Sequence, residues 1–336
     1  AMFSGEVGGQ TRHWLALKGE AQTVGALQGG PADFSMTVSE LGLAMNWASN
    51  GAEVIDLSAD PLQFGAGEQA LAFDFDGARG EVLSASAQAS LSVGGWVQAE
   101  GDWALSLSRD TVSLANGDEV AVNGLSLGGD QLALFAGMQA GTAAAVGVSA
   151  SGGQVAATLF TAQDPEDDRE WWALQADAAT VSLQGVPDIQ AQGQDLSLAF
   201  NEADDPAEVI DFATTPWAVA TGADSSINLD LAGDQGRLAQ AAGQFELQLS
   251  EFVHARGELA LSVSDRSLSL ANGQSVLTQV MTLGAAHLDV FAGVGGPHVV
   301  DDSGTSNPDA VGWVLQDASL ALALARTREV QVTAED

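Results

Sequence analysis

The chain has 336 residues, of which 45 are acidic and 10 are basic, so its formal net charge is −35 at pH 7; it contains no cysteine. This negative charge excludes binding to a nucleic-acid backbone, which requires clustered Lys and Arg, and docking onto an anionic membrane leaflet. The lack of cysteine excludes disulfide scaffolds, thiolate metal sites and cysteine nucleophiles.

Hydrophobic residues make up 46% of the chain, which is enough for a folded core and incompatible with general disorder. The longest apolar stretch, residues 132–148, is interrupted by Gln139, Thr142 and several glycines, so we expect no membrane insertion. The chain opens with Ala1-Met2-Phe3 and shows no secretory signal. We interpret it as a piece of a longer protein.

Alternating residue patterns predict β-strands along nearly the whole chain, because a period of two is typical of half-buried strands. Residues 237–242 include helix-forming side chains, but the corresponding residues 81–86 alternate, so a strand is predicted there as well. The clearest alternating runs cover residues 71–76, 82–93, 259–264 and 320–325.

Glycine-containing pairs divide these runs. Asn116-Gly117 and Asn272-Gly273 predict tight hairpins in which both turn residues have positive φ. Further breaks are predicted at Gly29-Gly30, Gly94-Gly95 and Gly128-Gly129. The spacing corresponds to about nine or ten strands in each of two blocks of about 120 residues, Trp14 to Phe135 and Trp171 to Phe291, which is typical of an all-β architecture.

Two five-residue sequences occur twice, in the same order. Residues 52–56 (Ala-Glu-Val-Ile-Asp) return as residues 207–211, and residues 113–117 (Ser-Leu-Ala-Asn-Gly) return as residues 269–273. The shifts are 155 and 156 residues, which indicates tandem repetition. The predicted recurring anchors are Trp14, Trp171, Trp313, Phe135, Phe291, Asn116, Gly117, Asn272 and Gly273.

The repetition predicts the domain organisation. Residues 1–13 are the tail of a preceding unit, residues 14–168 form unit 1, residues 169–310 form unit 2, and residues 311–336 start a third unit. Residues 138–168 and 294–310 are predicted to be variable connectors. We expect tandem units of antiparallel β-meander or sandwich type, stacked into an elongated array; the alternative is a solenoid-like twisted sheet.

Catalytic motifs have weak support. Residues 124–128 (Gly-Leu-Ser-Leu-Gly) match the string of a nucleophile elbow, but strands rather than a strand–turn–helix flank them. None of the four histidines, His13, His254, His287 and His298, recurs at a corresponding position of the other block. Paired carboxylates for a glycosidase-type hydrolase remain the least favoured alternative, because no pair stands out. No catalytic residue is predicted.

Calcium is the one cofactor that the sequence leaves open, since carboxylate oxygens suit hard cations. Neither an EF-hand loop nor the calcium-binding nonapeptide is present, so solvated acidic loops are the alternative. The candidate ligands are Asp74, Asp76, Asp164, Asp167, Asp168, Asp301 and Asp302.

The tryptophans that do not recur have two interpretations. Exposed rings could stack on sugars, whereas packing in the core is the ordinary role of a large aromatic side chain. These residues are Trp47, Trp96, Trp103, Trp172 and Trp217.

The order of several short segments resembles the long tandem β repeats of very large secreted or surface proteins of aquatic bacteria, which often also carry hemolysin-type calcium-binding repeats. The segments are Val186-Pro-Asp-Ile189, Leu196-Ser-Leu-Ala-Phe-Asn201, Val209-Ile-Asp-Phe212, Phe252–Gly257, Phe291-Ala-Gly293 and Ala310-Val-Gly-Trp313. The resemblance implies a non-catalytic extracellular or cell-surface array with spacer, fibre, stalk or adhesive roles.

We therefore expect a structural repeat whose partners are neighbouring units of the same polymer. The alternative is a calcium-assisted module that binds glycans or other surface polymers. The high negative charge would keep a long array soluble and extended.

Overall fold

The structure is a computed structural model that describes residues 2–7, 9–29, 34–49, 53–65, 71–77, 80–223, 225–299 and 305–327. Within these ranges the chain contains no α-helix, and 3-10 turns such as η4 (Pro206–Glu208) and η5 (Gly233–Gln235) are short. The all-β prediction is confirmed, including a strand at β14 (Leu238–Leu249), where helix-forming residues had raised a question.

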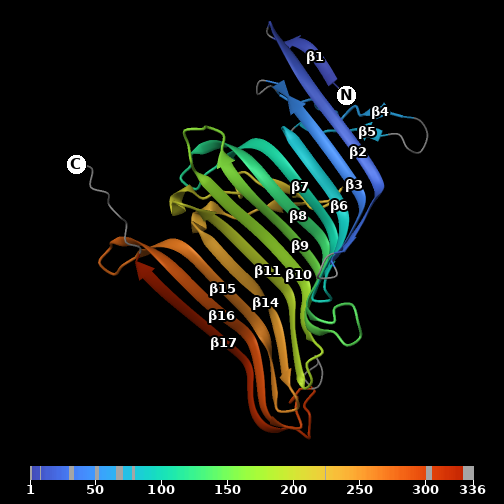
Figure 1. The fold of residues 1–336 in the computed structure, drawn as a ribbon. Helices are drawn as coiled ribbons and strands as arrows, with labels where there is room; N and C mark the ends of the chain where they lie inside the picture. Colours follow the sequence, from blue (N-terminus) through green and yellow to red (C-terminus); the bar gives the residue numbers. More distant parts are fainter. Residues whose placement is uncertain are drawn as a thin grey trace.

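Thirteen strands form one antiparallel sheet in which neighbours along the chain are neighbours in space (Figure 1). Two small hairpins, β4–β5 and β12–β13, interrupt the meander. The sheet consists of β1 (Met2–Val7), β2 (Gln10–Gly29), β3 (Phe34–Ala48), β6 (Val82–Val93), β7 (Val97–Ser113), β8 (Glu119–Met138), β9 (Val146–Ala162), β10 (Glu170–Gln184), β11 (Ile189–Ala203), β14, β15 (Val253–Ser269), β16 (Ser275–Val294) and β17 (Val311–Thr327). The hairpins consist of β4 (Leu62–Phe64), β5 (Leu71–Phe73), β12 (Trp217–Ala220) and β13 (Ser226–Leu229).

The strands are longer and fewer than predicted, with eight from β2 to β9. One reason is that Gly128-Gly129, predicted to end a strand, lies inside β8. The ladder with β9 shifts register just beyond it, where Gln131 has a φ of 52°. A β-bulge of this kind bends a strand without ending it.

Bulges recur at corresponding places. Glu40 in β3 and Asp195 in β11 have positive φ at register shifts, and so do Gln131 in β8 and His287 in β16. The long strands accordingly curve along their length (Figure 1).

The predicted hairpins at the two Asn-Gly pairs are present, but their geometry differs. Gly117 has a φ of 90° and donates its amide to the carbonyl of Leu114 at 2.9 Å, whereas Asn116 keeps a negative φ. The Asn116 side chain instead accepts a hydrogen bond from the amide of Asp118 at 2.9 Å. Only one residue per turn therefore needs the left-handed region, because the asparagine acts through its side chain. Asn272 and Gly273 repeat this arrangement.

The two halves of the chain, β2–β9 and β10–β17, have the same element order. The strand pairing shows to which strands the two end strands, β1 and β17, correspond. Phe3 pairs with Trp14 as Phe160 of β9 pairs with Trp171, so β1 corresponds to the end of β9. Likewise Gly293 pairs with Gly312 of β17 as Gly137 pairs with Gly147 of β9. On this correspondence β17 closes the second half, whereas the sequence had suggested that residues 311–336 open a third.

The main core lies on one face of the sheet. There the described part of the segment between β11 and β14, residues 204–223 and 225–237, covers strands β7 to β11; we call it the second insertion. The first insertion lies between β3 and β6, and its described residues, 49, 53–65, 71–77 and 80–81, lie on the same face over β2. The core residues are Val112, Leu114, Val122, Ala156, Phe160, Trp171, Ala173, Ala203, Val209, Ile210, Phe212, Trp217, Val219, Leu229 and Leu231.

Candidate functional site

The most extensive contact outside the strand ladders joins the second insertion to the first half of the chain. The amide of Asp211 donates to the carbonyl of Ser113, and the amide of Ala115 donates to the carbonyl of Val209, both at 2.8 Å. Leu114 and Ile210 form an isolated antiparallel bridge between them. We call this contact the latch, because it ties the insertion of one half to a hairpin of the other.

The second insertion is anchored to its own half by two further hydrogen bonds. Trp171 donates its indole Nε1 to the carbonyl of Glu208 at 2.7 Å, and Asn201 donates its side-chain amide to the carbonyl of Ile210 at 2.9 Å. Val209 and Ile210 are 0% exposed. The insertion is thus held rigidly between two surfaces.

The first insertion has the same anchors but lacks the outer partner within the described part of the chain. Trp14 Nε1 donates to the carbonyl of Glu53 at 2.9 Å, and Asn46 donates to the carbonyl of Ile55 at 2.8 Å. Ile55 is half-buried here, whereas its counterpart Ile210 is fully buried.

The Gly-Leu-Ser-Leu-Gly string of residues 124–128 forms a groove for the second insertion. A side chain on Gly124 would collide with the ring of Trp217, and one on Gly128 would collide with the carbonyl of Ala220. Ser126 is 1% exposed and accepts a hydrogen bond from Trp217 Nε1 at 3.2 Å. The motif therefore lies in a continuous strand and packs against a partner, which is not the geometry of a nucleophile elbow.

Aromatic rings complete this contact. Trp217 meets Phe160 of β9 edge to face, with ring centroids 4.8 Å apart, and Phe212 lies 5.9 Å from Phe160. Of the tryptophans that do not recur, Trp217 is buried at 6% exposure, while Trp96 and Trp172 are more than half exposed. The packing interpretation therefore holds for Trp217 and not for Trp96 and Trp172.

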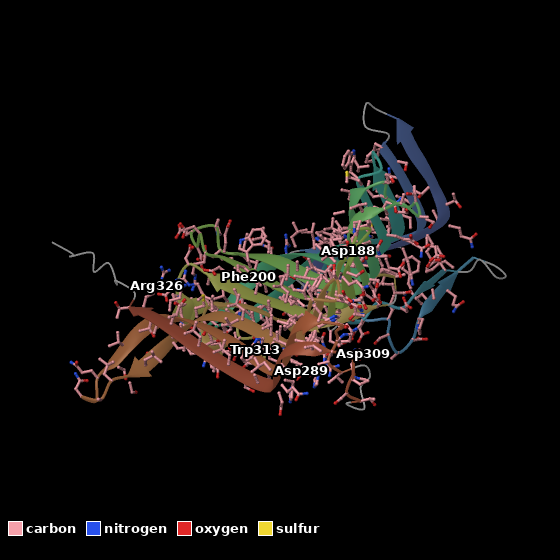
Figure 2. The ribbon with its side chains drawn as sticks, turned by 90° about the horizontal axis from the view of Figure 1, so that it is seen from below. Asp188, Phe200, Asp289, Asp309, Trp313 and Arg326 are labelled. Atoms are coloured by element: carbon pink, nitrogen blue, oxygen red, sulfur yellow. The ribbon has the colours of Figure 1, made fainter. Side chains whose placement is uncertain are left out.

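The predicted recurring anchors differ in their burial. Trp171 and Phe291 are buried, whereas Trp14 and Phe135 are half-buried. Trp313 does not fit the prediction, because it lies on the edge strand β17 with 86% of its surface exposed (Figure 2). The corrected correspondence gives the reason: Trp313 stands opposite Ala292 of β16 and is not the counterpart of Trp171.

The candidate calcium ligands are dispersed. Asp74 pairs with Lys18 at 3.1 Å, and Asp167 pairs with Arg169 at 2.7 Å. The side-chain hydrogen bond from Arg169 is the main reason why the pKa of Asp167 lies below its ordinary value. Asp76, Asp164 and Asp168 are exposed, and Asp301 and Asp302 lie outside the described residues. In the described ranges, no group of three or more acidic or histidine side chains is placed to hold a metal ion.

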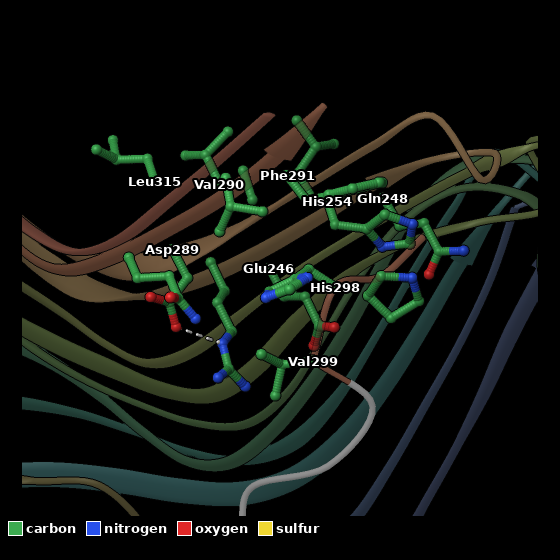
Figure 3. A pocket seen from close by; sticks show the side chains of 15 residues that line it. Glu246, Gln248, His254, Asp289, Val290, Phe291, His298, Val299 and Leu315 are labelled. Atoms are coloured by element: carbon green, nitrogen blue, oxygen red, sulfur yellow. Dashed lines mark hydrogen bonds and ion pairs between the residues drawn. The ribbon is translucent and has the colours of Figure 1, made fainter. Parts of the chain in front are cut away.

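A pocket of about 250 Å³ is lined by histidine and acidic residues that the sequence analysis did not connect with one another (Figure 3). His254 and His298 line it together with Glu246 and Asp289, and Asp289 is paired with Arg256 at 3.1 Å. Desolvation lowers the pKa of His254, although the charge of Glu246 acts in the opposite direction. The strand pairing of β14 to β16 brings Glu246, His254 and Asp289 together, and His298 reaches them from the segment after β16, so no local sequence signal could have revealed this proximity.

The face opposite the insertions carries rows of exposed and half-buried leucines that run from strand to strand. Leu83 pairs with Leu107, which pairs with Leu125, and Leu261 pairs with Leu283, which pairs with Leu322. No element of the described chain covers this surface, which we call the leucine face. Its members are between 41% and 56% exposed; they include Leu17, Leu43, Leu83, Leu105, Leu107, Leu125, Leu127, Leu198, Leu259, Leu261, Leu320, Leu322 and Leu324.

No protein-family model, no curated protein and no solved structure matches this chain. Among the described residues, none of the helical segments has the length and apolar character needed to cross a membrane. The geometry therefore carries the functional argument.

Proposed function

We infer that this chain is a non-catalytic structural part of a large extracellular or cell-surface protein, built from β units that join side by side. The latch is the observation that carries this proposal. It buries the insertion of one half against the other half through backbone hydrogen bonds and the Phe160–Trp217 contact. Such coupling between neighbours is how repeat proteins build rigid, extended arrays.

The dimensions of the sheet support a load-bearing or spacing role. Neighbouring strands lie about 4.8 Å apart, so thirteen strands span roughly 60 Å across the sheet. The free edges, β1 and β17, lie at opposite ends of this span (Figure 1). A chain of such units would form a long ribbon, and a net charge of −35 per chain would keep ribbons apart in solution.

Small-angle X-ray scattering of the purified chain tests this proposal. We expect the scattering of a flat particle, with a radius of gyration above the roughly 20 Å of a compact domain of this length. An isometric particle would contradict a ribbon. Turnover of a glycoside or ester substrate that is lost on Glu246→Gln or Asp289→Asn would contradict the absence of catalysis.

The leucine face favours a second candidate function, a surface-binding module. Exposed apolar patches of more than a few hundred Å² commonly mark interaction sites. Here the contact would be apolar, and it differs from the calcium-assisted glycan contact that the sequence alone suggested. Binding of the chain to alkyl-coated beads, lost on Leu107→Glu combined with Leu261→Glu, would support this function.

A further inference from the structure

The two repeated five-residue sequences are the two sides of one contact. In the latch, Val209–Asp211 belongs to the second occurrence of Ala-Glu-Val-Ile-Asp, and Ser113–Ala115 belongs to the first occurrence of Ser-Leu-Ala-Asn-Gly. The remaining occurrences, residues 53–56 and 269–271, make no such contact with each other in the described chain. Within the described chain, residues 53–56 and residues 269–271 therefore each have the sequence of one side of a latch without the other side opposite them.

Burial reflects this difference. Leu114 is 2% exposed in the latch, whereas its counterpart Leu270 is 47% exposed. Gly128 receives the carbonyl of Ala220, whereas the nearest atom to a side chain added at Gly284 is the carbonyl oxygen of Ala260 at 4.0 Å. The surface on β15–β17 that corresponds to the groove of the first half is thus open at Leu270 and Gly284 in this structure, whereas Val280 between them is buried at 8% exposure.

We propose that two copies of this chain join head to tail, with the first insertion of one copy docked on the uncovered surface of the other. We call residues 53–65 and 71–75 the head segment. We call the surface formed by Ser269–Ala271, Val280, Thr282, Gly284 and Ala325 the tail face. The inference rests on the proposed structural function and names the partner of each unit, which is a second copy of the same chain.

Side-chain sizes on the two surfaces are complementary. In the latch the large Trp217 lies against Gly124. The counterpart of Trp217 is Leu62, because Leu62 pairs with Phe73 as Trp217 pairs with Leu229. The counterpart of Gly124 on the tail face is Val280. A smaller head residue therefore meets a larger tail residue, so the local volume is preserved.

The reverse exchange occurs one strand further. Phe160 fills the latch from β9, and its counterpart on β17 is Ala325. The missing ring is matched by Phe64 and Phe73 in the head segment, which stand where the second insertion has Val219 and Leu229. These two rings pack at 4.9 Å, and Phe64 is 47% exposed. Volume-conserving exchanges of this kind are the ones a packed contact tolerates.

The strand edges of two copies allow the same arrangement. In the middle of the chain Ala157 of β9 pairs with Leu174 of β10, and Gly147 pairs with Gln184. The equivalent pairs across two copies are Leu322 with Leu17 and Gly312 with Leu27. Among the described residues β1 pairs with β2 only from Gln10 to Leu15, so the edge of β2 from Leu17 onward can accept β17. Only the residues of β17 from Ala323 onward would compete for the part of β2 up to Ala16.

Charge opposes this assembly over long distances, because each copy carries −35. Salt shortens the screening length from about 10 Å at 0.1 M to about 3 Å at 1 M. Head-to-tail association should therefore strengthen as salt is raised, in contrast to a contact made by opposite charges.

Sedimentation velocity over a range of protein and salt concentrations tests the proposal. The wild type should form chains that lengthen with protein concentration, because a head-to-tail contact does not close. Ile55→Glu on the head and Leu270→Glu on the tail should each weaken association at least about 100-fold. An equimolar mixture of the two variants should form a one-to-one dimer and nothing larger, since one intact head and one intact tail remain.

Leu107→Glu is the matched control, because Leu107 is as exposed as Leu270 but lies on the leucine face. It should assemble as the wild type does. A wild type that stays monomeric at high salt would overturn the proposal, as would a mixture without dimers or a control that abolishes assembly. Circular dichroism checks folding, and Leu62→Gln replaces Ile55→Glu if that variant does not fold. If the wild type stays monomeric but scatters as a flat particle, the head-to-tail contact is refuted, whereas the proposed structural function is still supported.

Discussion

At the scale of single residues, the two halves hold the same ion pair with its charges exchanged. Glu81 contacts Arg109 at 3.0 Å in the first half, and Arg237 contacts Asp265 at 2.9 Å in the second. The positions correspond, because Glu81 and Arg237 both precede a strand that pairs with β7 or β15. The second pair is the more buried, with the Asp265 side chain only 1% exposed. The fold therefore requires one positive and one negative side chain at these two positions, but it does not require that either charge occupy a particular one of them.

This exchange leads to a prediction for the free energy of unfolding. Asp265→Ala should cost about 3 kcal/mol, because it removes the buried carboxylate from the half-buried Arg237 and leaves the partly exposed Glu202 as its ion-pair partner. The double variant Arg237→Glu with Asp265→Arg should recover only part of that loss, since it copies the order found in the first half but places a second carboxylate beside Glu202. Urea denaturation of both variants measures the effect. Arg109→Ala, at an exposed arginine, should change stability by less than about 1 kcal/mol.

His254 leads to a second prediction, for the dependence of stability on pH. Burial holds the pKa of His254 below its ordinary value of 6.5, while Glu246 acts against this shift. The unfolded chain then binds the proton more readily, so His254 costs nothing above pH 6.5 and lowers stability as the pH falls from there toward its folded pKa. Glu246, Asp289 and Arg256 also face this pocket, and His254→Gln leaves them in place.

Urea denaturation at pH 7.5 and pH 5 measures this effect. The wild type should lose more stability than His254→Gln, by about 1.4 kcal/mol for each unit by which the pKa is lowered. His287→Gln, at a side chain that is 72% exposed, is the control and should follow the wild type. Equal losses in wild type and His254→Gln would contradict the prediction.

At the scale of elements, the groove in β8 explains a motif that sequence reasoning left without a role. Rejecting Gly124–Gly128 as a nucleophile elbow followed from its strand-like flanks. The positive role of the glycines could not be seen, because Trp217 and Ala220, which lie against them, come about 90 residues later in the chain. The repeated sequences did carry a signal for this contact. The Ala-Glu-Val-Ile-Asp segment and the Ser-Leu-Ala-Asn-Gly segment could have been considered as the two sides of one contact.

The groove predicts a contrast between two identical substitutions. Gly128→Ala should destabilise the chain by about 1–3 kcal/mol, because the added methyl group would overlap the carbonyl of Ala220. Gly284→Ala, at the corresponding and uncovered position, should be close to neutral in the isolated chain. Thermal unfolding at low protein concentration compares the two, and equal effects would show that the insertion does not pack on β8 as described.

At the scale of the whole molecule, local patterns predicted the strands and much less of their arrangement. Period-two alternation and the Asn-Gly pairs indicated antiparallel hairpins correctly. They could not show that Gly128-Gly129 stays within a strand, since a bulge at Gln131 takes up the distortion. The burial of one face by the insertions and the exposure of the other also arise from long-range contacts. Side chains on both faces alternate alike, so the sequence alone does not distinguish the covered face from the leucine face.

The position of the second insertion also determines how the chain should unfold. Residues 204–237 belong to the second half by sequence, but they are buried partly against the first half. The part of the chain that unfolds cooperatively therefore does not coincide with one sequence repeat, because its boundary lies several strands further along the chain. Stability then depends on nearest-neighbour coupling, and a terminal unit without a neighbour over its insertion is the first to open. A fragment cut at the sequence boundary would separate Trp217 from Phe160, whereas one cut after residue 237 would keep both.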